Sequence, residues 1–129
     1  MKTVDVHEHA VEDISLLRKT NVRVAAEVLA LLDHIEADPR AIDKLTTRGN
    51  NHFGAARIGV KRWESVWRRD GLWRFRMFDT PATGWRVIYG YNSKTRQICV
   101  LAVVKKEDFD YDDHESPIAK RILEDWRSI

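Results

Sequence analysis

The chain has 129 residues, a net charge of +2 and 43% hydrophobic residues. This length suits one domain with a modest core, and the composition is that of an ordinary folded protein, which excludes a disordered chain. Cys99 is the single cysteine, so an internal disulfide is excluded, and its apolar surroundings predict a small buried core residue. No segment approaches the apolar length of a membrane span or of a signal peptide, so we expect a cytoplasmic protein without a membrane partner.

Charge is distributed unevenly along the chain. Residues 48–106 contain thirteen basic and three acidic residues, a local net charge of +10, whereas residues 1–47 and 107–129 carry −3 and −5. A middle section this basic suits contact with a phosphate backbone. The alternative is that the acidic ends fold over the basic section and neutralise it, and the sequence leaves both open.

The N-terminal part predicts one strand and two helices. Polar and apolar residues alternate over residues 3–9, which predicts a short strand at or near a sheet edge. Residues 12–19 predict a short helix. Asn21 can cap a second helix that ends before Pro39. The second helix carries an apolar stripe with a 3.6-residue period: Ala25, Val28, Leu29, Leu32 and Ile35.

Residues 47–70 interrupt this pattern. Residues 46–59 are rich in Gly, Asn and Thr, which predicts a loop. Residues 60–67 fit a helical face, but they also fit a strand that closes on a hairpin turn at Asp70-Gly71, and we favour the strand. We therefore interpret 47–70 as a loop or insert within a single domain of residues 1–129.

The C-terminal part predicts three strands and a final helix. The strands cover residues 72–78, 84–91 and 97–104, and Ser116-Pro117 is typical of a helix start. The predicted order is β-α-α-β-β-β-α, an α+β fold. In it, two N-terminal helices pack on one face of a small antiparallel sheet, and a C-terminal helix follows. The other sheet face is expected to stay open to a ligand.

Cations break the apolar pattern of these strands. Arg74 and Arg76 are two residues apart and so share one strand face, and Arg86 lies in the next strand. Lys106 follows the last strand. Such cations repel one another, so folding alone gives little reason to gather them, and the set is typical of phosphate binding. The alternative is that they merely solvate an exposed face, where the loss of Arg86 would leave the fold intact.

The order and spacing of these motifs resemble the RelE/ParE superfamily of toxins from bacterial type II toxin–antitoxin systems. The resemblance rests on Lys44-Leu45, on the strand from Leu72 to Arg76, on the run from Trp85 to Tyr89 and on the basic pair that ends at Lys106. It covers about residues 3–47 and 72–124. It implies a RelE/ParE-like fold, and it favours the RelE-like branch of ribosome-dependent mRNA interferases, which are endoribonucleases.

The matching positions imply five catalytic residues: Arg74, Arg76, Arg86, Lys106 and Tyr111. Arginine replaces the lysine of the family in the first of these strands, and Lys106 replaces its arginine. RNA cleavage by the 2′-hydroxyl needs stabilisation of a phosphorane, and Arg76 and Arg86 suit this task because guanidinium binds two phosphate oxygens at once. Lys106 is then the candidate acid or base, and Tyr111 orients the 2′-hydroxyl or stacks on a base.

Five further cations could extend contact with RNA, or could simply form a solvated face: Lys61, Arg62, Arg68, Arg69 and Lys105. His7 and His9 share a strand face and suggest a metal, but we favour two exposed histidines on an edge strand and expect no metal or cofactor. The resemblance implies a cognate antitoxin, which would form a hetero-oligomer with the toxin, and mRNA on the ribosome as target. The alternatives are a ParE-like toxin that inhibits DNA gyrase without catalysis, and a non-toxic member.

Overall fold

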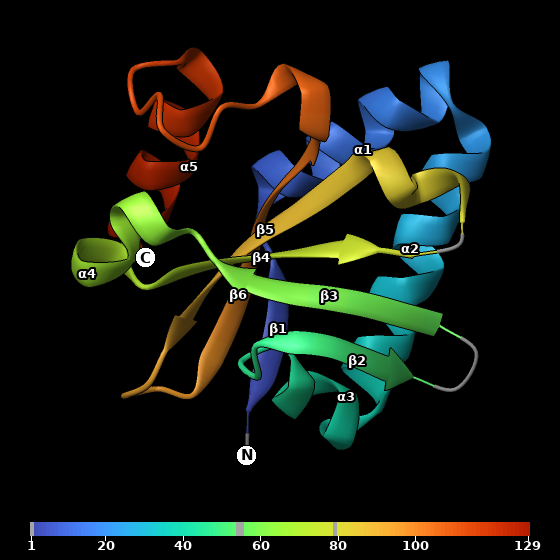
Figure 1. The fold of residues 1–129 in the computed structure, drawn as a ribbon, viewed down its shortest axis with the longest axis horizontal. Helices are drawn as coiled ribbons and strands as arrows, with labels where there is room; N and C mark the ends of the chain where they lie inside the picture. The colour runs from blue at the N-terminus through green and yellow to red at the C-terminus, as the bar shows by residue number, and fades with distance from the viewer. Residues whose placement is uncertain (1, 54–55, 79) are drawn as a thin grey trace.

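The computed structural model describes residues 2–53, 56–78 and 80–129, whose strands form a six-stranded sheet with the order β1-β6-β5-β4-β3-β2 (Figure 1). The strands are β1 (Thr3–Val6), β2 (Gly49–Phe53), β3 (Ala56–Arg62), β4 (Leu72–Met77), β5 (Trp85–Asn92) and β6 (Gln97–Lys105). β1 runs parallel to β6, whereas all other pairs of neighbouring strands are antiparallel. The α+β class is therefore confirmed, whereas the expected purely antiparallel sheet is wrong.

Five helices accompany the sheet in the described part of the chain: α1 (Glu8–Thr20), α2 (Val22–Ala37), α3 (Pro39–Lys44), α4 (Trp67–Asp70) and α5 (Pro117–Arg127). Two predicted caps are confirmed. The side chain of Asn21 accepts a hydrogen bond from the Val24 N–H at 3.2 Å, and Ser116 Oγ accepts one from Ala119 at 3.2 Å. None of the helices in these residue ranges has the length and apolar character that crossing a membrane requires.

The first helix begins earlier than predicted. His7 Nδ1 accepts a hydrogen bond from the His9 N–H at 3.1 Å, so His7 caps α1 and β1 ends at Val6. β1 is an edge strand, as predicted. The two histidines, however, are not exposed strand residues, because both lie half-buried at the start of a helix.

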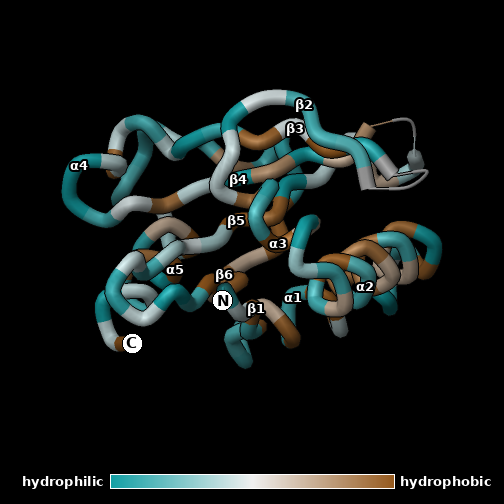
Figure 2. Tube along the Cα trace, turned by 90° about the horizontal axis from the view of Figure 1, so that it is seen from below, coloured by the Kyte–Doolittle hydropathy of each residue, from teal (hydrophilic) through white to brown (hydrophobic). Residues whose placement is uncertain are grey.

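The described residues of 47–70, which leave out 54–55, are not the loop that the sequence predicted. β2 and β3 form a hairpin, and β3 pairs with β4, so these residues add two strands to the sheet. Most of β2 is hydrophilic, in contrast to β6 (Figure 2), which explains why the sequence pattern did not predict a strand. After β3 come a short 3-10 turn and α4, so the strand predicted over residues 60–67 extends only to Arg62. Gly71 ends α4 in the left-handed conformation, with φ 63°, and does not form the predicted hairpin turn.

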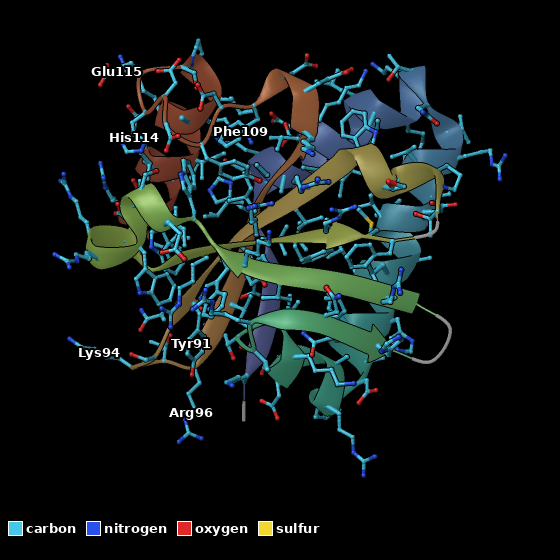
Figure 3. The ribbon with its side chains drawn as sticks, in the orientation of Figure 1. Tyr91, Lys94, Arg96, Phe109, His114 and Glu115 are labelled. Atoms are coloured by element: carbon cyan, nitrogen blue, oxygen red, sulfur yellow. The ribbon has the colours of Figure 1, made fainter. Side chains whose placement is uncertain are left out.

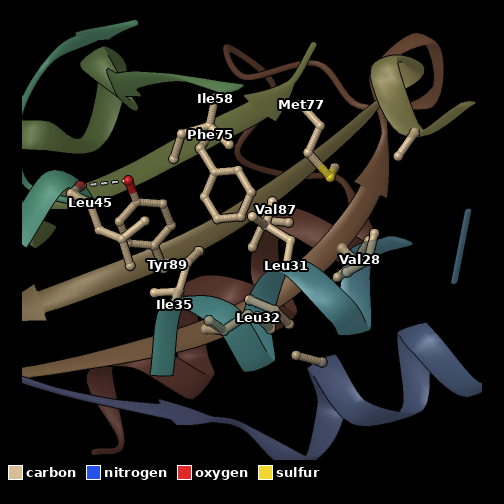
Figure 4. Packing of buried hydrophobic residues seen from close by; sticks show 14 of the residues in the cluster. Val28, Leu31, Leu32, Ile35, Leu45, Ile58, Phe75, Met77, Val87 and Tyr89 are labelled. Carbon is tan, nitrogen blue, oxygen red and sulfur yellow. Dashed lines mark hydrogen bonds between the residues drawn. The ribbon is translucent and has the colours of Figure 1, made fainter. Parts of the chain in front are cut away.

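The first face of the sheet, which we define as the face toward α1 and α2, is apolar. Figure 4 shows Leu32 and Ile35 of α2 beneath the aromatic rings of Phe75 and Tyr89, and Val28 farther along the same helix. Other core residues on this face include Leu31, Leu45, Ile58, Trp73, Met77 and Val87. The buried Tyr89 hydroxyl donates a hydrogen bond to the Leu45 carbonyl at 2.6 Å, so this core satisfies the polar group that it contains.

The second face, on the opposite side of the sheet, is covered in part by α5. A second apolar cluster there joins strand residues to α5 residues: Leu72, Ile88, Leu101, Ala102, Ile122 and Leu123. A shift in the β5–β6 pairing near Ile88 lets the consecutive Leu101 and Ala102 both contribute to this cluster. Cys99 is buried in it, as predicted. The expectation that this face stays open is therefore wrong where α5 lies.

Trp126 anchors α5. A Cβ atom on Gly90 would lie 2.7 Å from its indole ring, so the ring packs directly on the β5 backbone. The indole Nε1 donates a hydrogen bond to the Asp70 carbonyl at 2.7 Å, and Arg127 bonds both oxygens of the Asp70 carboxylate at 3.0 Å. α5 is thereby joined to α4, and the views in Figures 1 and 2 place it well apart from α2. It also contacts α1, because Arg121 donates to the carboxylate of Asp13 at 2.8 Å.

Candidate functional site

Beyond the area that α5 covers, the second face carries arginines. Arg76 of β4 lies directly opposite Arg86 of β5, and Arg74 lies opposite Ile88. The intervening Phe75 and Val87 belong to the core of the first face. Strand alternation therefore brings the three arginines to one face, as the sequence predicted.

Arg86 differs from the prediction, because its side chain is buried and only 2% of the residue is exposed. Its Nη1 atom donates to the carbonyl oxygens of Thr83 and Trp85, both at 2.9 Å. Its Nε atom is buried and has no hydrogen-bond partner among the described residues. The expectation of an exposed Arg86 is therefore wrong, and the prediction that its removal leaves the fold intact loses the reason that was given for it.

Burial lowers the pKa of Arg86, and the neighbouring charge of Arg76 lowers it further. Within residues 2–53, 56–78 and 80–129, no carboxylate lies within 4.0 Å of the guanidinium groups of Arg74, Arg76 or Arg86. A buried charge without an opposite charge destabilises a fold, so such groups are usually paired. The three arginines therefore form a cationic site without a carboxylate partner among the residues that the structure describes.

Tyr111 completes this group. The guanidinium carbon of Arg74 lies 4.6 Å from the centroid of the Tyr111 ring. Burial raises the pKa of Tyr111, while the charges of Arg74 and Arg86 act in the opposite direction. The hydroxyl is buried and makes no well-aligned hydrogen bond in the described part of the chain, although the Arg74 side chain approaches it as a donor. The hydroxyl is therefore protonated and can donate a hydrogen bond beside the three cations. We refer to Arg74, Arg76, Arg86 and Tyr111 together as the arginine group.

The segment after β3 holds Tyr111 in place. Trp63 Nε1 and Ser65 Oγ both donate to the Tyr111 carbonyl, at 2.8 and 2.7 Å. The Trp63 ring also meets the rings of Tyr111 and Phe109 edge to face, with centroids 5.6 and 5.4 Å apart. Residues 47–70, which we interpreted as an insert, thus position a site residue. The sequence analysis missed Trp63 and Ser65 because these contacts join residues 46 and 48 positions apart.

Phe78 is a third residue that the sequence analysis missed. The guanidinium groups of Arg76 and Arg57 lie 4.5 and 4.6 Å from its ring centroid. Gly59 makes room for the ring, since a Cβ atom there would lie 3.0 Å from it. Phe78 lines a hollow of about 180 Å³ together with Arg74 and Arg76. An aromatic ring among cations can stack on a base, and only the β3–β4 pairing reveals this arrangement.

Of the five cations predicted to bind RNA, Lys61 and Arg62 lie beside the arginine group, and the other three are exposed elsewhere. Lys61 lines the same hollow as Arg76, and Arg62 lines a neighbouring hollow of about 140 Å³ with Arg74 and Tyr111. Arg68 and Arg69 are exposed on α4. Lys105 is also exposed, and its amine pairs with Glu107 at 2.6 Å.

Lys106 is exposed in the short turn that follows β6. No contact among the described residues places its amine with the arginine group. His114, the histidine closest to Tyr111 in the sequence, shares a hydrogen bond of 2.8 Å with Ser65 Oγ. It lines a different hollow, of about 570 Å³, next to α5. Figure 3 shows His114 and Glu115 in the loop that leads into α5.

The arginine group offers several fixed donors and no acceptor carboxylate, so its chemistry is that of binding and stabilising an anion with several oxygens. No protein-family model, curated protein or solved structure matches the chain. The functional argument therefore rests on the residues of this site.

Proposed function

We propose that the protein is the toxin of a type II toxin–antitoxin system and cleaves mRNA as a RelE-like, ribosome-dependent interferase. The observation that supports this most is the nearly complete burial of Arg86 beside Arg76, with no carboxylate partner in the described chain. The fold holds a charge that destabilises it, and a phosphate group would compensate that charge. The two N-terminal helices on one face of the sheet agree with the family fold, and the β2–β3 hairpin is an addition to its order.

In this proposal, the arginine group binds the scissile phosphate. The 2′-hydroxyl gives up its proton to a base and its oxygen attacks phosphorus. The bond from phosphorus to the 5′ oxygen breaks, a 2′,3′-cyclic phosphate forms, and the 5′ oxygen takes up a proton. Arg76 and Arg86 stabilise the extra negative charge of the phosphorane. The Tyr111 hydroxyl donates a hydrogen bond to a phosphate oxygen or to the 2′-oxygen, and Phe78 stacks on a base.

Lys106 is the proposed acid or base, and the ribosome is proposed to supply what the free protein lacks. The amine of Lys106 has no contact that orients it toward the arginine group in the described chain, and His114 lines a different hollow. Positioned substrate can contribute a large part of the catalysis that an incomplete site lacks. We therefore propose that cleavage is weak with free RNA and strong on ribosomes in the cytoplasm, and that an antitoxin covers the basic face.

The test compares Arg76→Ala with Arg23→Ala, which removes an exposed arginine of α2 that lies away from the site. Arg76 is half-buried, so its loss perturbs the fold less than the loss of Arg86. Arg76→Ala should lower mRNA cleavage on ribosomes on the order of 10²-fold, the usual effect of removing one transition-state donor, and Arg23→Ala should not.

The readouts are mapped mRNA ends in a purified translation system and circular dichroism of each variant. Cleavage by folded Arg76→Ala at the wild-type rate would contradict the proposal. A DNA supercoiling assay runs in parallel, because gyrase inhibition without mRNA cleavage would favour the ParE-like alternative.

A further inference from the structure

Two histidines from the start of the chain meet a carboxylate from its last helix. His9 Nδ1 lies 2.7 Å from Asp125 Oδ2, and His7 Nδ1 lies 3.6 Å from the same oxygen. The two imidazole rings are tilted, with their centroids 5.0 Å apart. His9 and Asp125 are 116 positions apart in the sequence, so the fold alone assembles this cluster.

We propose that His7, His9 and Asp125 bind one Zn²⁺ ion. Each residue offers a ligand atom, and these atoms lie within 4.8 Å of one another. Zinc prefers nitrogen, sulfur and carboxylate ligands, and tetrahedral bonds of about 2.0–2.1 Å place neighbouring ligand atoms about 3.3 Å apart. The separations of 2.7 and 3.6 Å between Asp125 Oδ2 and the two Nδ1 atoms lie on either side of that distance. Coordination through His7 Nδ1 would replace the hydrogen bond that this atom accepts from the His9 N–H, so the His7 ring must turn when the ion binds. A water molecule would fill the fourth position.

The charges around the cluster leave the Asp125 carboxylate available. Arg121 is the adjacent cation, and both of its Nη atoms donate to the carboxylate of Asp13, at 2.8 Å each. Its Nε atom lies 3.9 Å from Asp125 Oδ2 and makes no hydrogen bond in the described structure. Asp13 therefore balances the charge of Arg121, and the two imidazoles are the closest partners of Asp125.

The exposed fractions of the three side chains also suit an ion that enters from solvent. The side chain of Asp125 is 12% exposed, whereas those of His7 and His9 are 21% and 35% exposed. The carboxylate is thus shielded from water, while the imidazoles form the entrance. A bound ion would join the start of α1 to the end of α5, so it should stabilise the fold against unfolding.

The competing interpretation is an ion pair between protonated His9 and Asp125. The hydrogen bond to Asp125 raises the pKa of His9, so a proton and a metal ion compete for this ring. The two interpretations differ in what they require of His7. Zinc needs its imidazole, whereas the ion pair needs only His9.

The variant His7→Asn distinguishes the zinc site from the ion pair. Asparagine is a favourable N-cap, so the variant keeps the role of His7 at the start of α1 while it removes a metal ligand. Asp125→Asn and His9→Gln remove the other two ligands. His52→Asn is the control, because His52 is an exposed histidine of β2, an edge strand at the opposite end of the sheet from β1.

The experiment titrates metal-stripped full-length protein with Zn²⁺ at mildly alkaline pH, with a chromophoric chelator as competitor. Wild type and His52→Asn should bind one equivalent, and His7→Asn, His9→Gln and Asp125→Asn should each bind on the order of 10²-fold more weakly. Co²⁺ in place of Zn²⁺ should give the strong visible bands of tetrahedral coordination in wild type and not in His7→Asn.

Melting curves with and without Zn²⁺ provide the second readout and check that each variant folds. Zinc should raise the melting temperature of wild type and His52→Asn but not that of His7→Asn. Equal zinc affinity in wild type and His7→Asn would overturn the proposal, and so would the absence of zinc binding by wild type.

Discussion

The two faces of the sheet differ in how completely their buried polar groups are hydrogen-bonded. On the first face, the Tyr89 hydroxyl is fully buried, and it donates to the Leu45 carbonyl at 2.6 Å. On the second face, Arg86 is 2% exposed, and its Nε atom has no hydrogen-bond partner among the described residues. Burying an unpaired charge destabilises a fold, whereas a satisfied hydroxyl does not. The comparison indicates that the first face stabilises the fold, whereas the buried arginine of the second face lowers stability at the proposed phosphate site.

The largest expected effect comes from Arg86→Met, which keeps most of the side-chain volume and removes the charge. We expect mRNA cleavage to fall on the order of 10²-fold, because a phosphate-binding donor is lost. The free energy of unfolding should stay unchanged or rise, because removing a buried charge without a carboxylate partner offsets the loss of its hydrogen bonds to the Thr83 and Trp85 carbonyls. Cleavage assays on ribosomes and urea denaturation measure the two effects. A large loss of stability would show that Arg86 is a structural residue and would remove the contrast between the faces.

Gly90→Ala should have the next largest effect. A Cβ atom at Gly90 would lie 2.7 Å from the Trp126 ring, so we expect a loss of about 1–3 kcal/mol in the free energy of unfolding. Gly84→Ala is the matched control, because no heavy atom lies within 4 Å of the corresponding Cβ. Equal stability of the two variants in urea would mean that α5 is not packed tightly on β5. The α5 part of the second face would then differ from the core of the first.

Tyr89→Phe tests the first face. The change removes a buried hydroxyl and leaves the Leu45 carbonyl without this donor, so we expect the free energy of unfolding to fall by about 1–2 kcal/mol. Cleavage of mRNA should stay at the wild-type rate in the folded protein, because Tyr89 belongs to the opposite face. If activity falls with little change in stability, the faces are not functionally separate.

Ser65→Ala should have the smallest effect. It removes one of two donors to the Tyr111 carbonyl and leaves the Trp63 indole in place. A hydrogen bond of this kind contributes about 0.5–1.5 kcal/mol, so cleavage should fall by roughly 2–10-fold through a less well-positioned Tyr111. Ser15→Ala, at an exposed position of α1, is the control. A wild-type rate for Ser65→Ala alongside a reduced rate for Tyr111→Phe would mean that Trp63 alone positions the tyrosine.

The sequence by itself determined the elements that depend on local signals. The caps at Asn21 and Ser116, the apolar stripe of α2 and the alternation in β4 were predicted, because each depends on residues a few positions apart. The same alternation predicted that Arg74 and Arg76 share one face of their strand.

Only the tertiary structure decided the rest, because those features depend on contacts between distant residues. The polar residues of β2 become a strand because β3 pairs with them and in turn with β4. Arg86 is buried within a group that includes Tyr111, and Trp63 holds that tyrosine from 48 positions away. His7 and His9 meet Asp125 because the two ends of the chain come together in space. No local pattern encodes these long-range contacts, so the sequence predicted which strands carry cations, whereas the burial of Arg86 and the partners of Tyr111 and Asp125 were not predictable from it.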